Sequence, residues 1–160
     1  FVVHPAISLE NVARCSLVWT AIIAQRLGLF LKWPNDLVTR EGKKVGGVLT
    51  ELVDIRPTLV LGIGLNVSHR HPPIENSSSL FLENIKKERA EIVRMLGEVV
   101  YKSNPNDSLD LWRERALYLG QKVRVRDIEG EMTGIREDGA LLIGEHVIMT
   151  GDVHLIEDKR

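Results

Sequence analysis

Apolar residues recur at helical spacing over the stretch Leu9–Leu27, and this periodicity predicts a long helix. Ser8 precedes the stretch as a helix N-cap and Gly28 follows it as a C-cap, which places the two ends of the helix. A second amphipathic helix is expected over Ala90–Tyr101. A third is expected around three apolar residues: Leu109, Trp112 and Leu117.

Extended apolar stretches separated by turn residues fill the chain between the first two helices. They are Leu29–Trp33, Leu37–Thr39, Lys44–Val53 and Thr58–Val67. The last two stretches each contain a pair of glycines, Gly46 with Gly47 and Gly62 with Gly64. Glycine weakens a strand interior and often marks a close approach of a ligand or another backbone. We therefore expect these two strands to form one wall of a binding site.

The character of the chain changes near Leu119, where short apolar runs punctuated by glycines begin. Five short strands in so few residues are typical of a small barrel of the SH3-like type. The predicted fold class is α/β (α+β), with a mixed sheet packed against helices in residues 1–118 and a small β domain in residues 119–160.

The composition is that of an ordinary globular protein, with 44% hydrophobic and 27% charged residues among 160. Lys and Arg number 21 against 22 Asp and Glu, so non-specific binding of nucleic acid has no support. No apolar run is long enough to span a membrane, and no signal peptide is visible. The single cysteine, Cys15, is expected to be a buried, inert thiol, which fits a cytoplasmic location.

The residues that could carry chemistry fall in three short motifs. They are Lys32-Trp33-Pro34-Asn35-Asp36, Lys44-Val45-Gly46-Gly47 and Gly62-Ile63-Gly64-Leu65-Asn66. Lysines can neutralise phosphate or carboxylate charge, and glycines let a ligand lie against the backbone. Taken alone, each motif is better explained as a turn, a bulge or a solvated strand residue. The combination, in this order, favours a ligand site.

The three motifs together resemble the central domain of biotin–protein ligases, and the last 40 or so residues are similar to the small C-terminal domain of that family. The resemblance implies ATP-dependent attachment of biotin to a lysine of a biotin carboxyl carrier protein through biotinyl-5'-AMP. It assigns the biotin-facing backbone to four glycines: Gly46, Gly47, Gly62 and Gly64. Lys44 is then the catalytic cation that contacts the biotin carboxylate and the α-phosphate.

The resemblance also implies a nucleotide end for the same site. Lys32, Asn35 and Asn66 are expected to contact the nucleotide, while Asp36 is expected to be catalytic by helping the acceptor lysine. Asp36 and Asn66 are in addition the candidate ligands of Mg²⁺, which the family uses with ATP. Trp33 is expected to be a core residue.

Family members carry a Gly- and Arg-rich loop, a Ser/Thr pair and a Gln before the first helix, and the printed sequence begins after that region. We therefore expect this chain alone to be weakly active or inactive. Two alternatives remain open. The chain could be a ligand-binding or assembly module that pairs as a homodimer or with a complementing N-terminal chain. It could also be a relative of the lipoate ligases, although the lysine motifs favour biotin. The sequence shows no DNA-binding domain.

Overall fold

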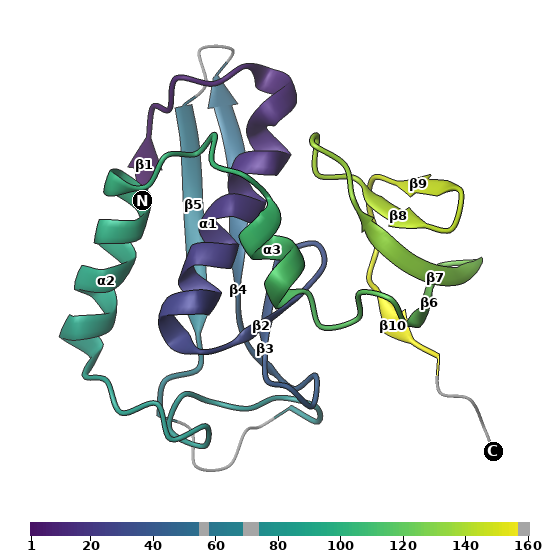
Figure 1. Cartoon of the computed structure of the whole chain (residues 1–160). Helices are drawn as coiled ribbons and strands as arrows, with labels where there is room; N and C mark the ends of the chain where they lie inside the picture. Colours follow the sequence, from purple (N-terminus) through teal and green to yellow (C-terminus); the bar gives the residue numbers. More distant parts are fainter. Residues whose placement is uncertain (55–57, 69–73, 157–160) are drawn as a thin grey trace.

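The computed structural model describes residues 1–54, 58–68 and 74–156, and it contains two antiparallel sheets and a layer of helices (Figure 1). The first sheet consists of β1 (Val2–Val3), β2 (Phe30–Lys32), β3 (Asp36–Val38), β4 (Lys44–Asp54) and β5 (Thr58–Leu65). The helices are the 3₁₀ turn η1 (Leu9–Asn11), α1 (Val12–Leu27), α2 (Arg89–Lys102) and α3 (Asp110–Arg115). The second sheet consists of β6 (Lys122–Val125), β7 (Ile128–Ile135), β8 (Leu141–Ile143), β9 (His146–Ile148) and β10 (His154–Leu155).

The strands of the first sheet follow the order β1-β5-β4-β3-β2, and each neighbouring pair is antiparallel. The mixed sheet predicted from the sequence is therefore wrong. The strands β2 to β5 follow one another through short connections, and short connections can join antiparallel neighbours only. Parallel pairing occurs in two isolated bridges, Leu31 with Ala116 and Lys44 with Ser77.

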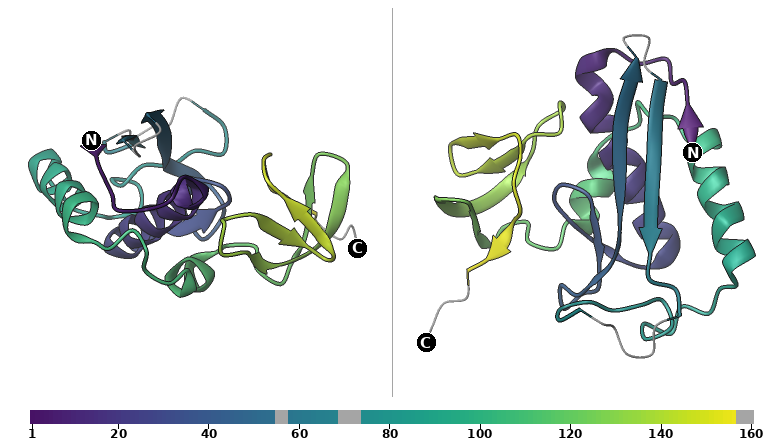
Figure 2. Two further views of the ribbon diagram at one scale, coloured as in Figure 1. Left: turned by 90° about the horizontal axis from the view of Figure 1, so that it is seen from above. Right: turned by 180° about the vertical axis from the view of Figure 1, so that it is seen from behind.

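The helices cover one face of the first sheet, and the view from behind shows the other face of β4 and β5 without a helix over it (Figure 2). Residues of β5 alternate between the two faces, as the pleat of a strand requires. Leu59 and Leu61 point toward the helices and are buried, and they pack in one core with Leu17 and Trp19 of α1. The covered face thus holds the core, and the opposite face remains open for a ligand.

The first predicted helix is confirmed, with a local difference at its N-terminal end. Gly28 ends α1 in the left-handed conformation (φ 68°), as its position predicted. Ser8 makes no capping hydrogen bond, because its hydroxyl donates to Glu10 Oε1 at 3.2 Å. The third helix ends at Arg115. Two residues later, the backbone amide of Leu117 donates a hydrogen bond to the carbonyl oxygen of Leu31 in β2. No helix among the described residues is long and apolar enough to cross a membrane.

The C-terminal sheet contains the five short strands that the sequence predicted, in the order β10-β6-β7-β8-β9. Val123, Leu141 and Ile143 are buried between its strands and belong to the same apolar core as the first sheet. Within residues 119–156 no pairing joins the two end strands, β9 and β10, so a closed barrel is not found.

Candidate functional site

An open cleft of about 890 Å³ lies on the helix-free face of the first sheet. We call it the glycine cleft. It is lined by the start of β4, the end of β5, the turn before β3 and the segment 74–77. All of the sequence-predicted site residues except Lys32 line it: Asn35, Asp36, Lys44, Gly46, Gly47, Gly62, Gly64 and Asn66. The fold therefore brings together motifs that are up to 31 positions apart.

Three of the four glycines form the wall of this cleft. Gly47 and Gly64 are directly opposite each other in the β4–β5 ladder, and Gly62 is opposite Leu49. Residues directly opposite in an antiparallel pair share one face, and every second residue of a strand returns to it. A Cβ atom added to Gly64 would meet nothing within 4 Å, and one added to Gly62 would lie 3.9 Å from Leu49. The absent side chains therefore leave room above the backbone.

Gly46 has a different structural role from its neighbour Gly47. It is buried, and an added Cβ would press on the carbonyl oxygen of Gly64 and lie 2.7 Å from Leu65 Cδ2. Close packing of β4 against β5 thus requires a glycine at this position. Its backbone lines the cleft, but the missing side chain makes space for the sheet itself.

Lys44 and Asp36 place a cation and a carboxylate at one end of the cleft. Lys44 Nζ lies 2.5 Å from Asp36 Oδ1, and the two side chains are 54% and 17% exposed. The backbone of Lys44 is held on both sides, because its amide donates to Asn76 O and its carbonyl accepts from Ser78 N. The ammonium group thus projects from an anchored strand end and remains accessible to a ligand.

The two asparagines are held by backbone contacts around the same end of the cleft. The carbonyl of Asn35 accepts a hydrogen bond from Val48 N at 3.0 Å, which ties the turn to β4. Asn66 follows β5, and its side-chain amide donates to Ser78 O at 3.0 Å. Hydrogen bonds among the described residues do not use its Oδ1, so this acceptor can serve a ligand. These contacts explain how the turn, β4 and the segment after β5 form one rigid wall.

Lys32 is the one predicted site residue that lies outside the cleft lining. It is directly opposite Asp36 in the β2–β3 pairing, which puts both residues on the same face of that hairpin. Its nucleotide contact remains a prediction.

The candidate metal ligands provide one carboxylate, and that carboxylate is paired with Lys44. Groups of three or more His, Cys, Asp or Glu side chains that could hold a metal are not found in the part of the chain that the structure describes. The described side chains by themselves do not fit a bound Mg²⁺, which prefers octahedral oxygen coordination. Mg²⁺ therefore stays a prediction from the family resemblance.

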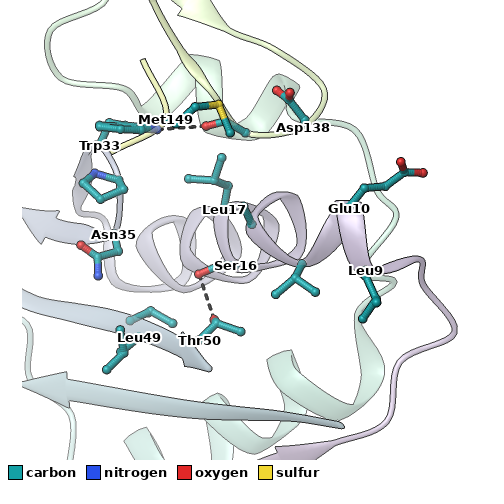
Figure 3. Close-up of a pocket in the computed structure, with 15 residues that line it drawn as sticks. Leu9, Glu10, Ser16, Leu17, Trp33, Asn35, Leu49, Thr50, Asp138 and Met149 are labelled. Atoms are coloured by element: carbon teal, nitrogen blue, oxygen red, sulfur yellow. Dashed lines mark hydrogen bonds between the residues drawn. The ribbon is translucent and has the colours of Figure 1, made fainter. Parts of the chain in front are cut away.

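A second cavity, of about 600 Å³, adjoins the glycine cleft and shares Asn35, Val48 and Leu49 with it. Figure 3 shows this cavity between α1, the turn before β3 and the C-terminal sheet. Its wall is mostly apolar and includes a hydrogen bond of 2.9 Å between the hydroxyl groups of Thr50 and Ser16. Sequence reasoning missed this cavity, because its walls come from segments more than 100 positions apart.

Fold and cleft together define a class of protein, the biotin/lipoate protein ligases. The sequence profile described as "Biotin/lipoate A/B protein ligase family" matches residues 16–68, which contain the three motifs. The chain is also similar to a Biotin--[acetyl-CoA-carboxylase] ligase of Mycobacterium tuberculosis. The two are 33% identical over 141 residues, covering 77% of this chain and 52% of that protein.

Solved structures narrow the class. The chain matches the apo structure of the biotin protein ligase of Aquifex aeolicus with a TM-score of 0.82 at 28% sequence identity. The match covers 98% of this chain and 80% of the Aquifex chain. The same ligase in complex with biotin and ATP has a TM-score of 0.77 at 28% identity, covering 99% and 77%. This chain belongs to the biotin protein ligase family. It spans about half the length of the curated relatives it matches.

Proposed function

We propose that the glycine cleft binds biotin and the nucleotide of ATP, and that it serves the ligation of biotin to a lysine of a biotin carboxyl carrier protein through biotinyl-5'-AMP. The observation that carries the proposal is the position of Lys44 beside the flat surface of Gly47 and Gly64. A thin apolar ring system fits over a backbone without side chains, while the ammonium group pairs with the carboxylate at the end of its chain. The matched ligase of Aquifex aeolicus is known in complex with biotin and ATP, which supports both ligands.

In the first step of this reaction, a carboxylate oxygen of biotin attacks the α-phosphorus of ATP. The bond to the bridging oxygen breaks, and pyrophosphate leaves with the electron pair. Negative charge gathers at the α-phosphate during the attack, and the Lys44 ammonium lies where it can offset that charge. Asn35 and Asn66, with Lys32 beyond them, form the nucleotide end of the site.

In the second step, the amine of the acceptor lysine attacks the acyl carbon of biotinyl-5'-AMP. An amide bond forms, AMP leaves, and the attacking nitrogen gives up its proton. We assign to Asp36 the orientation of that amine, because its carboxylate lines the cleft and lies beside the Lys44 ammonium. The acceptor must approach from the open, helix-free side of the sheet.

Titration calorimetry of the chain with biotinyl-5'-AMP tests the proposal, with lipoyl-5'-AMP as the competing ligand. We expect a one-to-one complex with biotinyl-5'-AMP that is tighter than the complex with lipoyl-5'-AMP. Removal of the Lys44 charge should weaken it. Binding of lipoyl-5'-AMP without binding of biotinyl-5'-AMP would assign the chain to lipoate chemistry instead.

The free edge of β4 supports a second role as an assembly module. Pairing with β3 ends at Gly47, although β4 continues to Asp54. Three apolar side chains in the uncovered half are exposed: Leu49 55%, Leu52 45% and Val53 63%. A long apolar edge of this kind is a template for another strand. We propose that a further polypeptide segment, from a second chain or a complementing N-terminal chain, pairs here during catalysis.

Carrier biotinylation tests the second role independently of ligand binding. The chain is incubated with ATP, biotin and an apo carrier domain, with and without a separate polypeptide that carries the N-terminal part of a related ligase. We expect strong stimulation by the added polypeptide. Equal biotinylation without it would contradict the assembly role, and it would also contradict the expectation of weak activity.

A further inference from the structure

The indole of Trp33 lies between the candidate site and the C-terminal sheet. It is only 3% exposed, and its Nε1 donates a buried hydrogen bond of 3.0 Å to the carbonyl oxygen of Gly139. Figure 3 shows this bond at the boundary of the second cavity. The two residues are 106 positions apart, so the bond joins the segment before β3 directly to the turn between β7 and β8.

Gly139 is held firmly where it accepts this bond. Its backbone has a φ of +91°, a conformation that favours glycine, and its amide donates to Arg136 O at 2.9 Å. An added Cβ would lie 3.1 Å from Leu17 Cδ1 and 3.4 Å from the backbone of Ala13 and Arg14 in α1. The turn is thus packed against α1 with no room to shift toward it.

Two arginines hold the same turn from the helix side. Arg14 of α1 and Arg113 of α3 each approach a carboxylate oxygen of Glu137 at 3.4 Å. Arg113 also donates to the carbonyl of Ile135 at 3.4 Å. Since the Glu137 side chain is 73% exposed, each ion pair stabilises the turn only modestly. The packing of Gly139 and the two ion pairs together fix its carbonyl.

On the other side of the bond, Trp33 precedes the site residues with only Pro34 between them. Asn35 bonds to Val48 of β4, and Asp36 pairs with Lys44. We infer that Trp33 is a positioning residue, and that its hydrogen bond to Gly139 makes the C-terminal sheet hold the Pro34–Asp36 turn against β4. The functional consequence of this role rests on the proposed function, because Asn35 and Asp36 are site residues there.

The competing explanation is that Trp33 is an ordinary core residue. Two other tryptophans provide matched controls, because Trp19 and Trp112 are each 1% exposed. Among the described residues, no hydrogen-bond partner is found for the Nε1 of either one. Replacing any of the three by phenylalanine removes a similar buried volume, and only the change at Trp33 removes a hydrogen bond.

Amide hydrogen exchange of the full 160-residue chain, followed by NMR, tests the inference. The diagnostic amide is that of Val48, which donates to Asn35 O. We expect its exchange to become on the order of tenfold faster in Trp33→Phe, the equivalent of one buried hydrogen bond. Rates are referred to the global stability of each variant, measured by urea unfolding. Unchanged Val48 exchange, or the same acceleration in Trp19→Phe and Trp112→Phe, would overturn the inference.

Glu137→Gln provides a second test that leaves the core untouched, in case Trp33→Phe does not fold. Loss of both ion pairs loosens the turn that presents Gly139, so Val48 exchange should rise about twofold to fivefold. Exposed Glu129→Gln in the same sheet is the control and should leave Val48 unchanged. No effect of Glu137→Gln on Val48 would count against the inference.

Binding of biotinyl-5'-AMP adds the functional readout. We expect Trp33→Phe to weaken it several-fold more than Trp112→Phe does. If the unmodified chain does not bind this ligand, the proposed function fails, whereas the exchange result still decides whether the C-terminal sheet holds the turn.

Discussion

Lys44 and Asp36 form an ion pair at the end of the glycine cleft, although Asp36 is paired in the sheet with Gly47 and not with Lys44. The lysine side chain therefore extends along its own strand toward Gly47 to reach the carboxylate. An added Cβ on Gly47 would come within 3.4 Å of Asp36 Oδ1 and 3.9 Å of Lys44 Cε. The charge pair and the glycine surface are thus in contact, and one ligand can touch both.

Replacing Lys44 by Met removes the cation and keeps most of the side-chain volume. We expect the affinity for biotinyl-5'-AMP to fall about 10- to 100-fold, as for the loss of a charge-assisted hydrogen bond. Stability should change by less than about 1 kcal/mol, because the ion pair is partly exposed. Calorimetry and urea unfolding measure the two effects. Lys43→Met, next to it and also exposed, is the control and should bind normally.

Gly64→Ala should weaken ligand binding without lowering stability, whereas Gly46→Ala should lower stability. Alanine at 64 meets nothing within 4 Å, so the protein should be as stable as before while the added methyl group occupies the ligand surface. Alanine at 46 would press on Gly64 O and Leu65, which should cost about 1–3 kcal/mol. Thermal unfolding and titration with biotinyl-5'-AMP separate the two. A destabilised Gly64→Ala with normal binding would contradict the placement of the cleft.

The sequence predicted the strands and the first helix well, because their periodicities are local. It did not predict the sheet type, since pairing direction depends on which strands become neighbours. It also placed Leu117 in the third helix, whereas that residue bonds through its amide to Leu31. A tertiary contact with β2 overrides the local helical spacing there.

For the candidate site, the glycines and lysines could be recognised because backbone access and charge depend on residue type. The separate roles of Gly46 and Gly47 could not be predicted from the sequence, because the two residues differ only in which face of β4 they occupy. The hydrogen-bond partner of Trp33 could not be predicted from the sequence either. Its burial followed from residue type, but Gly139 is 106 positions away and lies in the turn between β7 and β8.

Leu52→Lys tests the free edge of β4. If another strand pairs there, a lysine should reduce that pairing, because charged side chains on an edge oppose strand addition. We expect at least a tenfold loss of stimulation by the added N-terminal polypeptide in the biotinylation assay. Val93→Lys, at an exposed apolar position on α2, is the control and should retain full stimulation. Loss of stimulation in both variants would point to a general effect of charge.

Gly139→Ala should destabilise the protein through both its backbone and its surroundings. The residue has a φ of +91°, and the new Cβ would lie 3.1 Å from Leu17 Cδ1. Together these effects should lower the free energy of unfolding by about 1–3 kcal/mol. Gly120→Ala is the matched control: its φ is +76°, but nothing lies within 4 Å of the added Cβ. Urea unfolding of the two variants should therefore separate the cost of crowding from the cost of the backbone conformation.

Cys15 should make the stability of the protein fall at alkaline pH. Burial raises the pKa of its thiol from 9.0 to about 11, and the nearby Arg14 offsets only part of that rise. Because the folded pKa lies above the unfolded one, the contribution of the neutral thiol is complete below pH 9.0 and is lost as the pH rises toward 11. Urea unfolding at pH 8 and pH 10.5 should therefore show a larger drop for the unmodified chain than for Cys15→Ala. The two proteins differ only at residue 15, so the difference between the two drops isolates the thiol. Equal drops would mean that Cys15 ionises as readily in the folded chain as in the unfolded one.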